Sequence, residues 1–406
     1  MNSYKDYCLS DNPFPTTPIL DPTSDNDRIN GRIFNPDIMV EEIKSLQSKI
    51  RRRLPLIYVE NSDFVRGVGK SALIVQQWRQ LRKDKGVTSI YIRSEKKFKP
   101  ADFAARFISQ WHQTGHLWPV VLSALASYVK ENPRGEITAA GAEHFAETFS
   151  QLPLRVISLS YFNVFNPGQL ITDLAVWARR QLGDGLPLEL AHTFFQSYLT
   201  DPRTFTDAYS KVLRKHKWDN ITMIAALYRL MKLGGYEYHH FFLDQFEDVV
   251  HGLSGKALIT FNTELRRLVE ASIDRATLIV SLHPGANATL RSDEGGDIRS
   301  IAPLDPRHVV SVWPLTKEEA SQLAKTYLDH FRLPELPPPD ALYPFTAGAI
   351  EEICDAFEGN IRNCLQAFNY AIEKGVDEDH SIIDRDFLVK HHSDITGRVH
   401  ADEVVL

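Results

Sequence analysis

The chain of 406 residues is poor in cysteine and in long apolar runs. Its three cysteines are too few and too widely spaced for a disulfide framework or a metal cluster, which favours a reducing compartment. The first eleven residues lack the apolar stretch of a signal peptide. The apolar-leaning runs, such as 119–129, are far shorter than the ~20 residues that span a bilayer. These absences predict a cytoplasmic protein without a membrane segment.

The chain also carries little net charge, because 46 lysines and arginines nearly balance 52 acidic residues, which leaves −6. A protein that binds nucleic acid over its whole surface is not expected from this balance, although local basic patches are compatible with it. Three basic clusters occur, at 49–53, 93–99 and 214–217. Each basic cluster, taken alone, is more simply explained as a solvent-exposed face. If all three lay on one side of the protein, they would form a basic track for DNA.

Hydrophobic periodicity indicates an α/β chain with a helical insertion. A strand, a loop, a helix and a strand over residues 54–92 have the pattern of a βαβ unit in a parallel sheet. Predicted strands at 238–243, 277–282 and 309–313 extend that sheet. The predicted divisions are an N-terminal arm and helix (1–53), a core (54–315) with a large helical insertion (about 99–237), a C-terminal α-helical lid (316–395) and a tail (396–406).

A glycine-rich segment lies between the first predicted strand and the first helix of the core. In that position backbone N–H groups converge on phosphate oxygens, and the helix N-terminus adds its positive dipole end. Lys70 is expected to contact the β- and γ-phosphates of ATP, and the Ser71 hydroxyl to bind Mg²⁺. Phe64 departs from the usual pattern, which has glycine at that place. The predicted phosphate-binding residues are Arg66, Gly67, Val68, Gly69, Lys70, Ser71 and Ala72.

A second motif is the apolar strand at 238–243, which is followed by Asp244. A carboxylate at the end of a strand beside a phosphate-binding loop is typical of an Mg²⁺ site, so Asp244 is predicted to be a metal-binding and catalytic residue. The next residue, Gln245, cannot take a proton from water. The base is therefore expected to be Glu247, three residues after Asp244, or Glu95, at the end of the second predicted strand.

Polar residues at two further places are expected to face the nucleotide. The strand at 277–282 contains Ser281 and is followed by His283, and either residue could sense the γ-phosphate. A structural role for His283 is equally compatible with the pattern. Arg362 follows Gly359 and Asn360 at the start of a late helix, where an arginine could reach the nucleotide from a lid.

In this order, the four motifs resemble those of the additional-strand P-loop ATPases. Within them the chain is similar to the AAA+ ATPases of the replication-initiator (origin-recognition) group and to the related STAND NTPases. Residues 244–247 (Asp-Gln-Phe-Glu) resemble the Walker B motif of some STAND proteins, and residues 12–15 and 30–32 resemble the arm and box that flank the adenine. Residues 234–236 carry a weaker likeness to P-loop ATPases of bacterial phage-defence loci.

The resemblance implies binding and slow hydrolysis of ATP with Mg²⁺, self-association and a protein partner. One class of function is an ATP-dependent assembly factor or loader that acts with a DNA-processing partner in defence, transposition or replication. The other is a nucleotide-gated signalling switch or scaffold that binds a protein and not DNA. In oligomers of this type an arginine of one subunit enters its neighbour's site, and the candidates are Arg291, Arg299 and Arg307.

Overall fold

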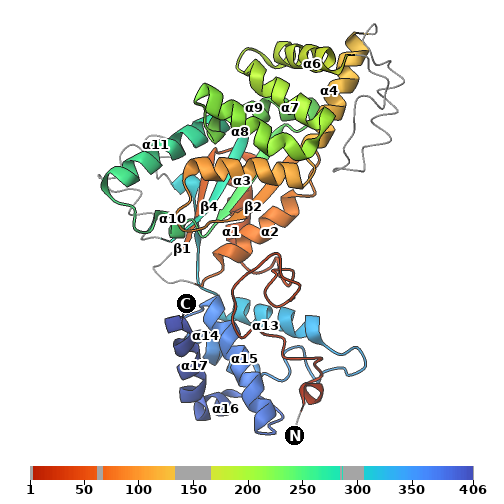
Figure 1. Ribbon diagram of the computed structural model, residues 1–406. Coiled ribbons are helices and arrows are strands. Elements are labelled where there is room, and N and C mark those ends of the chain that lie inside the picture. The colour runs from red at the N-terminus through yellow and green to blue at the C-terminus, as the bar shows by residue number, and fades with distance from the viewer. Residues whose placement is uncertain (1–2, 62–66, 133–165, 284–285, 287–305, 406) are drawn as a thin grey trace.

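The computed structural model describes residues 3–61, 67–132, 166–283, 286 and 306–405. Its centre is a five-stranded parallel sheet in the order β2-β3-β4-β1-β5 (Figure 1). Strand β4 lies between β1 and β3, which is the additional-strand arrangement that the sequence predicted. The strands are β1 (Leu56–Asn61), β2 (Val87–Arg93), β3 (Tyr238–Asp244), β4 (Ala276–Leu282) and β5 (Val309–Val312).

Alternate residues of the strands pack into two different hydrophobic cores, because successive side chains of a strand point to opposite faces. On β1, Leu56 and Tyr58 pack with the helical insertion, whereas Ile57 and Val59 pack with α2 (Lys70–Leu81), the arm and the lid. Both faces of the sheet are therefore covered. This explains why the strands read as nearly continuous apolar runs in the sequence.

Helices of the insertion cover one face of the sheet (Figure 1). Phe107 of α3 stacks on Phe241 of β3 with ring centroids 3.8 Å apart, and Trp111 contacts the same ring. Full burial of one such side chain contributes roughly 1.5–3 kcal/mol to stability. The α-helices packed in this core are α3 (Pro100–Gln113), α4 (Leu117–Glu131), α6 (Pro167–Leu182), α7 (Leu188–Thr200), α8 (Phe205–His216), α9 (Asn220–Leu230), α10 (Glu247–Val250) and α11 (Gly255–Ser272).

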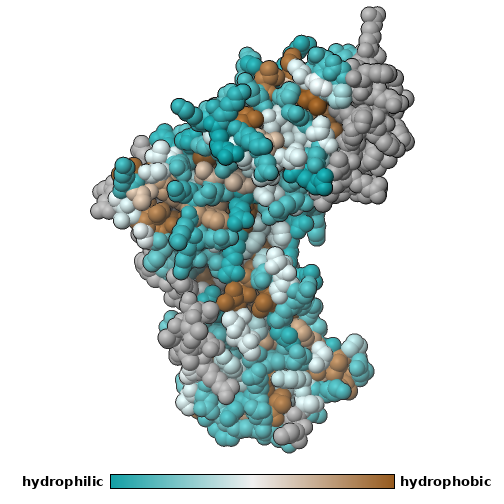
Figure 2. Space-filling model, viewed as in Figure 1, coloured by the Kyte–Doolittle hydropathy of each residue, from teal (hydrophilic) through white to brown (hydrophobic). Residues whose placement is uncertain are grey.

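The helices of the predicted lid form a second lobe (Figure 1), and Figure 2 shows a narrow waist between the two lobes where hydrophobic side chains reach the surface. The last lid helix, α17, crosses residue 395, so residues 396–405 continue that helix and do not form the separate tail that was predicted. The lid helices are α13 (Lys317–Phe331), α14 (Ala347–Ala356), α15 (Ile361–Asp377), α16 (Arg385–Lys390) and α17 (His392–Val405).

The N-terminal arm is packed onto the lid. Phe14 is 1% exposed, and its ring lies 5.7 Å from that of Tyr327 on α13 and 5.1 Å from that of Phe368 on α15. Asn369 Nδ2 donates a hydrogen bond of 2.7 Å to the carbonyl of Phe14, and Asn12 Nδ2 donates one of 3.1 Å to the carbonyl of Asn369. The arm then leads to α1 (Val40–Arg51), which precedes the first strand. Residues 12–15 thus attach the arm to the lid.

No helix in the described ranges has both the length and the apolar character that a bilayer crossing requires.

Candidate nucleotide-binding site

The described part of the glycine-rich loop, residues 67–69, leads directly into α2, which begins at Lys70. Gly67 and Gly69 have φ angles of 93° and 105°, which residues with a Cβ rarely adopt. A Cβ on Gly67 would lie 2.6 Å from Asn360 Oδ1, and one on Gly69 would lie 2.2 Å from Met39 Cε. Both positions therefore require glycine. The loop also lies at the N-terminus of a twelve-residue helix, where an anion is favoured.

Lys70 lies at the carboxyl edge of the sheet. Its Nζ donates a hydrogen bond of 2.8 Å to the carbonyl of Leu282, the last residue of β4, and lies 3.8 Å from Glu247 Oε1. The side chain is only 11% exposed. The ammonium group is thus fixed beside the ends of β3 and β4, on the side of the glycine-rich loop.

The carboxylate of Asp244 accepts hydrogen bonds from four donors. Its Oδ1 accepts from Ser71 Oγ at 3.0 Å, from Ser281 Oγ at 2.8 Å and from the N–H of Gln245 at 2.9 Å. Its Oδ2 accepts from the Tyr91 hydroxyl at 2.8 Å. Because Asp244 is 3% exposed, these donors offset the cost of burying its charge. Three predicted residues, Ser71, Asp244 and Ser281, are thereby brought together.

Gln245 contributes its backbone N–H to this cluster, whereas its side chain bonds a residue outside it. Its φ is 56°, its N–H also lies 2.7 Å from Ser281 Oγ, and its Oε1 accepts a hydrogen bond of 2.6 Å from Arg93 Nε at the end of β2. The side chain is therefore engaged by an arginine of the neighbouring strand.

Glu247 is the first residue of α10 (Glu247–Val250), and its side chain is 21% exposed. Burial raises the pKa of its carboxyl group above the ordinary value, and the nearby charge of Lys70 lowers it only in part. Its Oε2 is buried and has no hydrogen-bond partner among the described residues. The other candidate base, Glu95, is 64% exposed and pairs with Arg106 at 3.4 Å. Of the two, Glu247 is the residue that lies beside Lys70.

The start of α15 contacts the glycine-rich loop. The backbone N–H of Arg362 donates a hydrogen bond of 3.1 Å to the carbonyl of Gly67. Asn360 caps the helix by accepting from the N–H of Asn363, and Ile361 lies near Gly69. The segment 359–362 and the loop, which are distant in sequence, are thus adjacent in the fold.

The remaining predicted residues are distributed as follows. Val68 is 2% exposed and Ala72 lies in the first turn of α2. Arg307 lies on a short 3-10 helix before β5. Arg66, Arg291 and Arg299 lie outside the described residues.

The two histidines spaced four residues apart in the insertion have separate partners. His112 Nδ1 lies 2.5 Å from the Tyr198 hydroxyl, and His116 Nδ1 lies 2.5 Å from Thr114 Oγ1. Within the described ranges, no three His, Cys, Asp or Glu residues are grouped as metal ligands.

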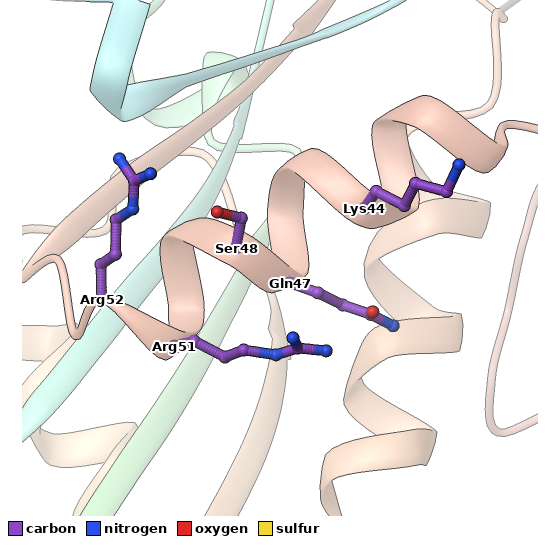
Figure 3. Close-up of a pocket in the computed structure, with 5 residues that line it drawn as sticks. All are labelled: Lys44, Gln47, Ser48, Arg51 and Arg52. Atoms are coloured by element: carbon purple, nitrogen blue, oxygen red, sulfur yellow. The ribbon is translucent and has the colours of Figure 1, made fainter.

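A hollow of about 310 Å³ lies on α1, lined by residues other than those of the glycine-rich loop (Figure 3). Figure 3 shows the side chains of Gln47 and Arg51 extending in the same direction from the helix, and Gln47 Nε2 lies 3.3 Å from Gln80 Oε1 of α2. The lining residues, Lys44, Gln47, Ser48, Arg51 and Arg52, recur at steps of three, one, three and one, which places them on one face of the helix. Part of the predicted basic cluster at 49–53 thus lines a surface hollow.

The parallel sheet, the glycine-rich loop between β1 and α2, and Asp244 at the end of β3 define an α/β protein of the P-loop class. No protein-family model matches the chain, and no curated protein matches it. Among solved structures, the chain is similar to a Walker-type ATPase of Pyrococcus abyssi, with 14% sequence identity and a TM-score of 0.39. That alignment covers 91% of this chain and 75% of the other.

Proposed function

We propose that the protein binds ATP with Mg²⁺ at this site and hydrolyses it slowly. The observation that supports the proposal is the convergence of Lys70, Ser71, Asp244 and Glu247 at one edge of the sheet. A buried ammonium, a hydroxyl held on a carboxylate and a second carboxylate with a raised pKa are the groups that phosphoryl transfer to water requires.

In this proposal the loop backbone and Lys70 bind the phosphates, and Ser71 and Asp244 hold Mg²⁺, which neutralises charge on the phosphate oxygens. The donor set fits the metal, because Ser71 Oγ already lies 3.0 Å from Asp244 Oδ1. Glu247 accepts the proton of the attacking water, and its buried Oε2 is the acceptor available for that water. Arg362, at the start of α15, contacts the nucleotide from the lid.

The first experiment measures ATP binding and phosphate release for the wild type and for Lys70→Ala. We expect Lys70→Ala to lose both, because the buried cation beside the loop is removed. The matched control is Lys211→Ala, an exposed lysine of α8, which should leave both unchanged. A wild-type protein that does not bind ATP in the presence of Mg²⁺ would refute the proposal.

At the level of biological role, we propose an ATP-dependent assembly factor that self-associates and acts with a DNA-processing partner. The basic face of α1 favours this role, because Arg51 and Arg52 are exposed side chains that can contact phosphates. The alternative is a nucleotide-gated switch that binds a protein partner. Gln245 favours the alternative, because a glutamine cannot act as the base and slow hydrolysis suits a timing function.

The response of the protein to duplex DNA distinguishes the two proposed roles. An assembly factor should bind DNA in a salt-dependent manner and hydrolyse ATP faster when DNA is present. The variant Arg51→Ala/Arg52→Ala should then lower the slope of log affinity against log salt by about two. Arg180→Ala, an exposed arginine of α6, is the control and should leave the slope unchanged. ATP binding without any response to DNA would favour the switch.

A further inference from the structure

Tyr91 lies on β2 on the same face of the sheet as Asp244. The register pairs Tyr91 with Phe242 and Arg93 with Asp244, so Tyr91 is diagonal to Asp244 across two neighbouring strands. Its ring packs against Trp78 of α2 with centroids 5.4 Å apart, and Trp78 Nε1 donates a hydrogen bond of 3.1 Å to the carbonyl of Ser89 on β2. The tyrosine ring is therefore held between the sheet and the helix that carries Ser71.

The hydroxyl of Tyr91 contacts the oxygen of Asp244 that the other donors leave aside. Ser71, Ser281 and the N–H of Gln245 all reach Oδ1, whereas Tyr91 reaches Oδ2 at 2.8 Å. Rotation of the carboxylate about its Cβ–Cγ bond would take Oδ1 away from Ser71. A donor fixed on Oδ2 opposes that rotation.

We propose that Tyr91 is a positioning residue for the metal site: its hydroxyl fixes the Asp244 carboxylate so that Oδ1 stays on Ser71. The inference rests on the proposed binding of ATP with Mg²⁺ and adds a residue that no sequence motif marks. Loss of a partner that orients a metal ligand typically lowers metal affinity about 10–100-fold.

The test is the Mg²⁺ dependence of binding of a fluorescent ATP analogue, which needs no turnover. Tyr91→Phe keeps the ring and removes the hydroxyl. We expect its Mg²⁺ midpoint to rise by about tenfold or more, while analogue binding without Mg²⁺ stays at the wild-type level. Tyr238→Phe is the matched control, because it removes another hydroxyl from the sheet, one that bonds Thr277 Oγ1 at 2.9 Å. Its midpoint should match that of the wild type.

A double-mutant cycle then shows whether Tyr91 acts through Asp244. In an Asp244→Asn background the Mg²⁺ response should be largely lost, and adding Tyr91→Phe should cause no further loss, because the carboxylate that the hydroxyl orients is gone. If thermal unfolding shows that Tyr91→Phe does not fold, Tyr91→Met is the second variant, since methionine fills irregular gaps and also lacks the hydroxyl.

An unchanged Mg²⁺ midpoint in a folded Tyr91 variant would overturn the inference and leave the proposed function intact. A wild type whose analogue binding does not respond to Mg²⁺ would instead refute the metal site itself. The two failures are therefore distinguishable in one titration series.

Discussion

Replacing Glu247 by glutamine removes a charge and nearly preserves the side-chain volume. Glu247 Oε1 lies 3.8 Å from Lys70 Nζ, which corresponds to an attraction of about 4 kcal/mol at an effective dielectric constant of ~20. The pKa of Glu247 is nevertheless raised, so the cost of burying the carboxylate outweighs this attraction. The ionised carboxylate of Glu247 therefore lowers the stability of the fold, and it lies beside Lys70, which is proposed to bind phosphate.

Glu247→Gln should therefore lower single-turnover hydrolysis of ATP by about 10²–10⁴-fold, the usual contribution of a general base. ATP affinity should be equal or higher, because Lys70 then interacts with phosphate without a competing carboxylate. Phosphate release after mixing with excess enzyme measures the first quantity, and a fluorescent-nucleotide titration measures the second.

The matched control is Glu95→Gln, which removes an exposed carboxylate paired with Arg106. Its hydrolysis rate should stay within about threefold of the wild type, as expected for a surface pair. If Glu247→Gln hydrolysed ATP at the wild-type rate, the assignment of the base would be wrong. If Glu95→Gln were the slow variant, the base would be the residue at the end of β2.

Three further outcomes are expected. Because burial raises the folded pKa of Glu247 above its ordinary value of 4.5, this carboxyl group lowers stability progressively as the pH rises from 4.5 through the folded pKa. Wild-type turnover should fall as the pH is lowered through the folded pKa, and the pH–rate profile of Glu247→Gln should lack this limb. Gly69→Ala should abolish nucleotide binding in a titration, because its φ is 105° and the added Cβ would lie 2.2 Å from Met39 Cε, whereas Gly348→Ala, with open space around the added Cβ, should bind normally. Phe14→Ala should lower the free energy of unfolding by about 3–5 kcal/mol, measured by urea denaturation, and a loss under 1 kcal/mol would contradict the packing of the arm.

The parallel sheet and the glycine-rich loop were predictable because their signals are local. The strand that ends in Asp244 and the Gly-Lys-Ser segment before a helix can each be recognised from about ten consecutive residues of the sequence. Helix α11 was absent from the prediction, although its buried Leu258, Phe261, Leu265 and Leu268 follow helical spacing. Helix α7 lies within the predicted helical insertion, but its own bounds were not predicted, because apolar residues occur nearly all round it and blur the periodicity.

The contacts that complete the site could not be predicted in this way. Tyr91 reaches Asp244 only because β2 and β3 are neighbours in a particular register, and no spacing along the chain encodes that distance. Likewise, the arm reads as polar and proline-rich, yet a few buried residues such as Phe14 anchor it to the lid. Pairings between distant segments arise from tertiary packing, which a local pattern does not report.

The hydrogen bond from the N–H of Arg362 to the carbonyl of Gly67 belongs to the main chain on both sides. Replacement of the Arg362 side chain leaves both atoms in place, except that proline would remove the N–H. At the other end, a Cβ added to Gly67 would lie 2.9 Å from Arg362 Cβ and would press the loop away from α15. Alanine scanning along the start of α15 would therefore leave this main-chain link in place, so the effect of a side-chain change there would not report the coupling to the loop. Because the link joins the two main chains, a displacement of the first turn of α15 would act directly on the glycine-rich loop.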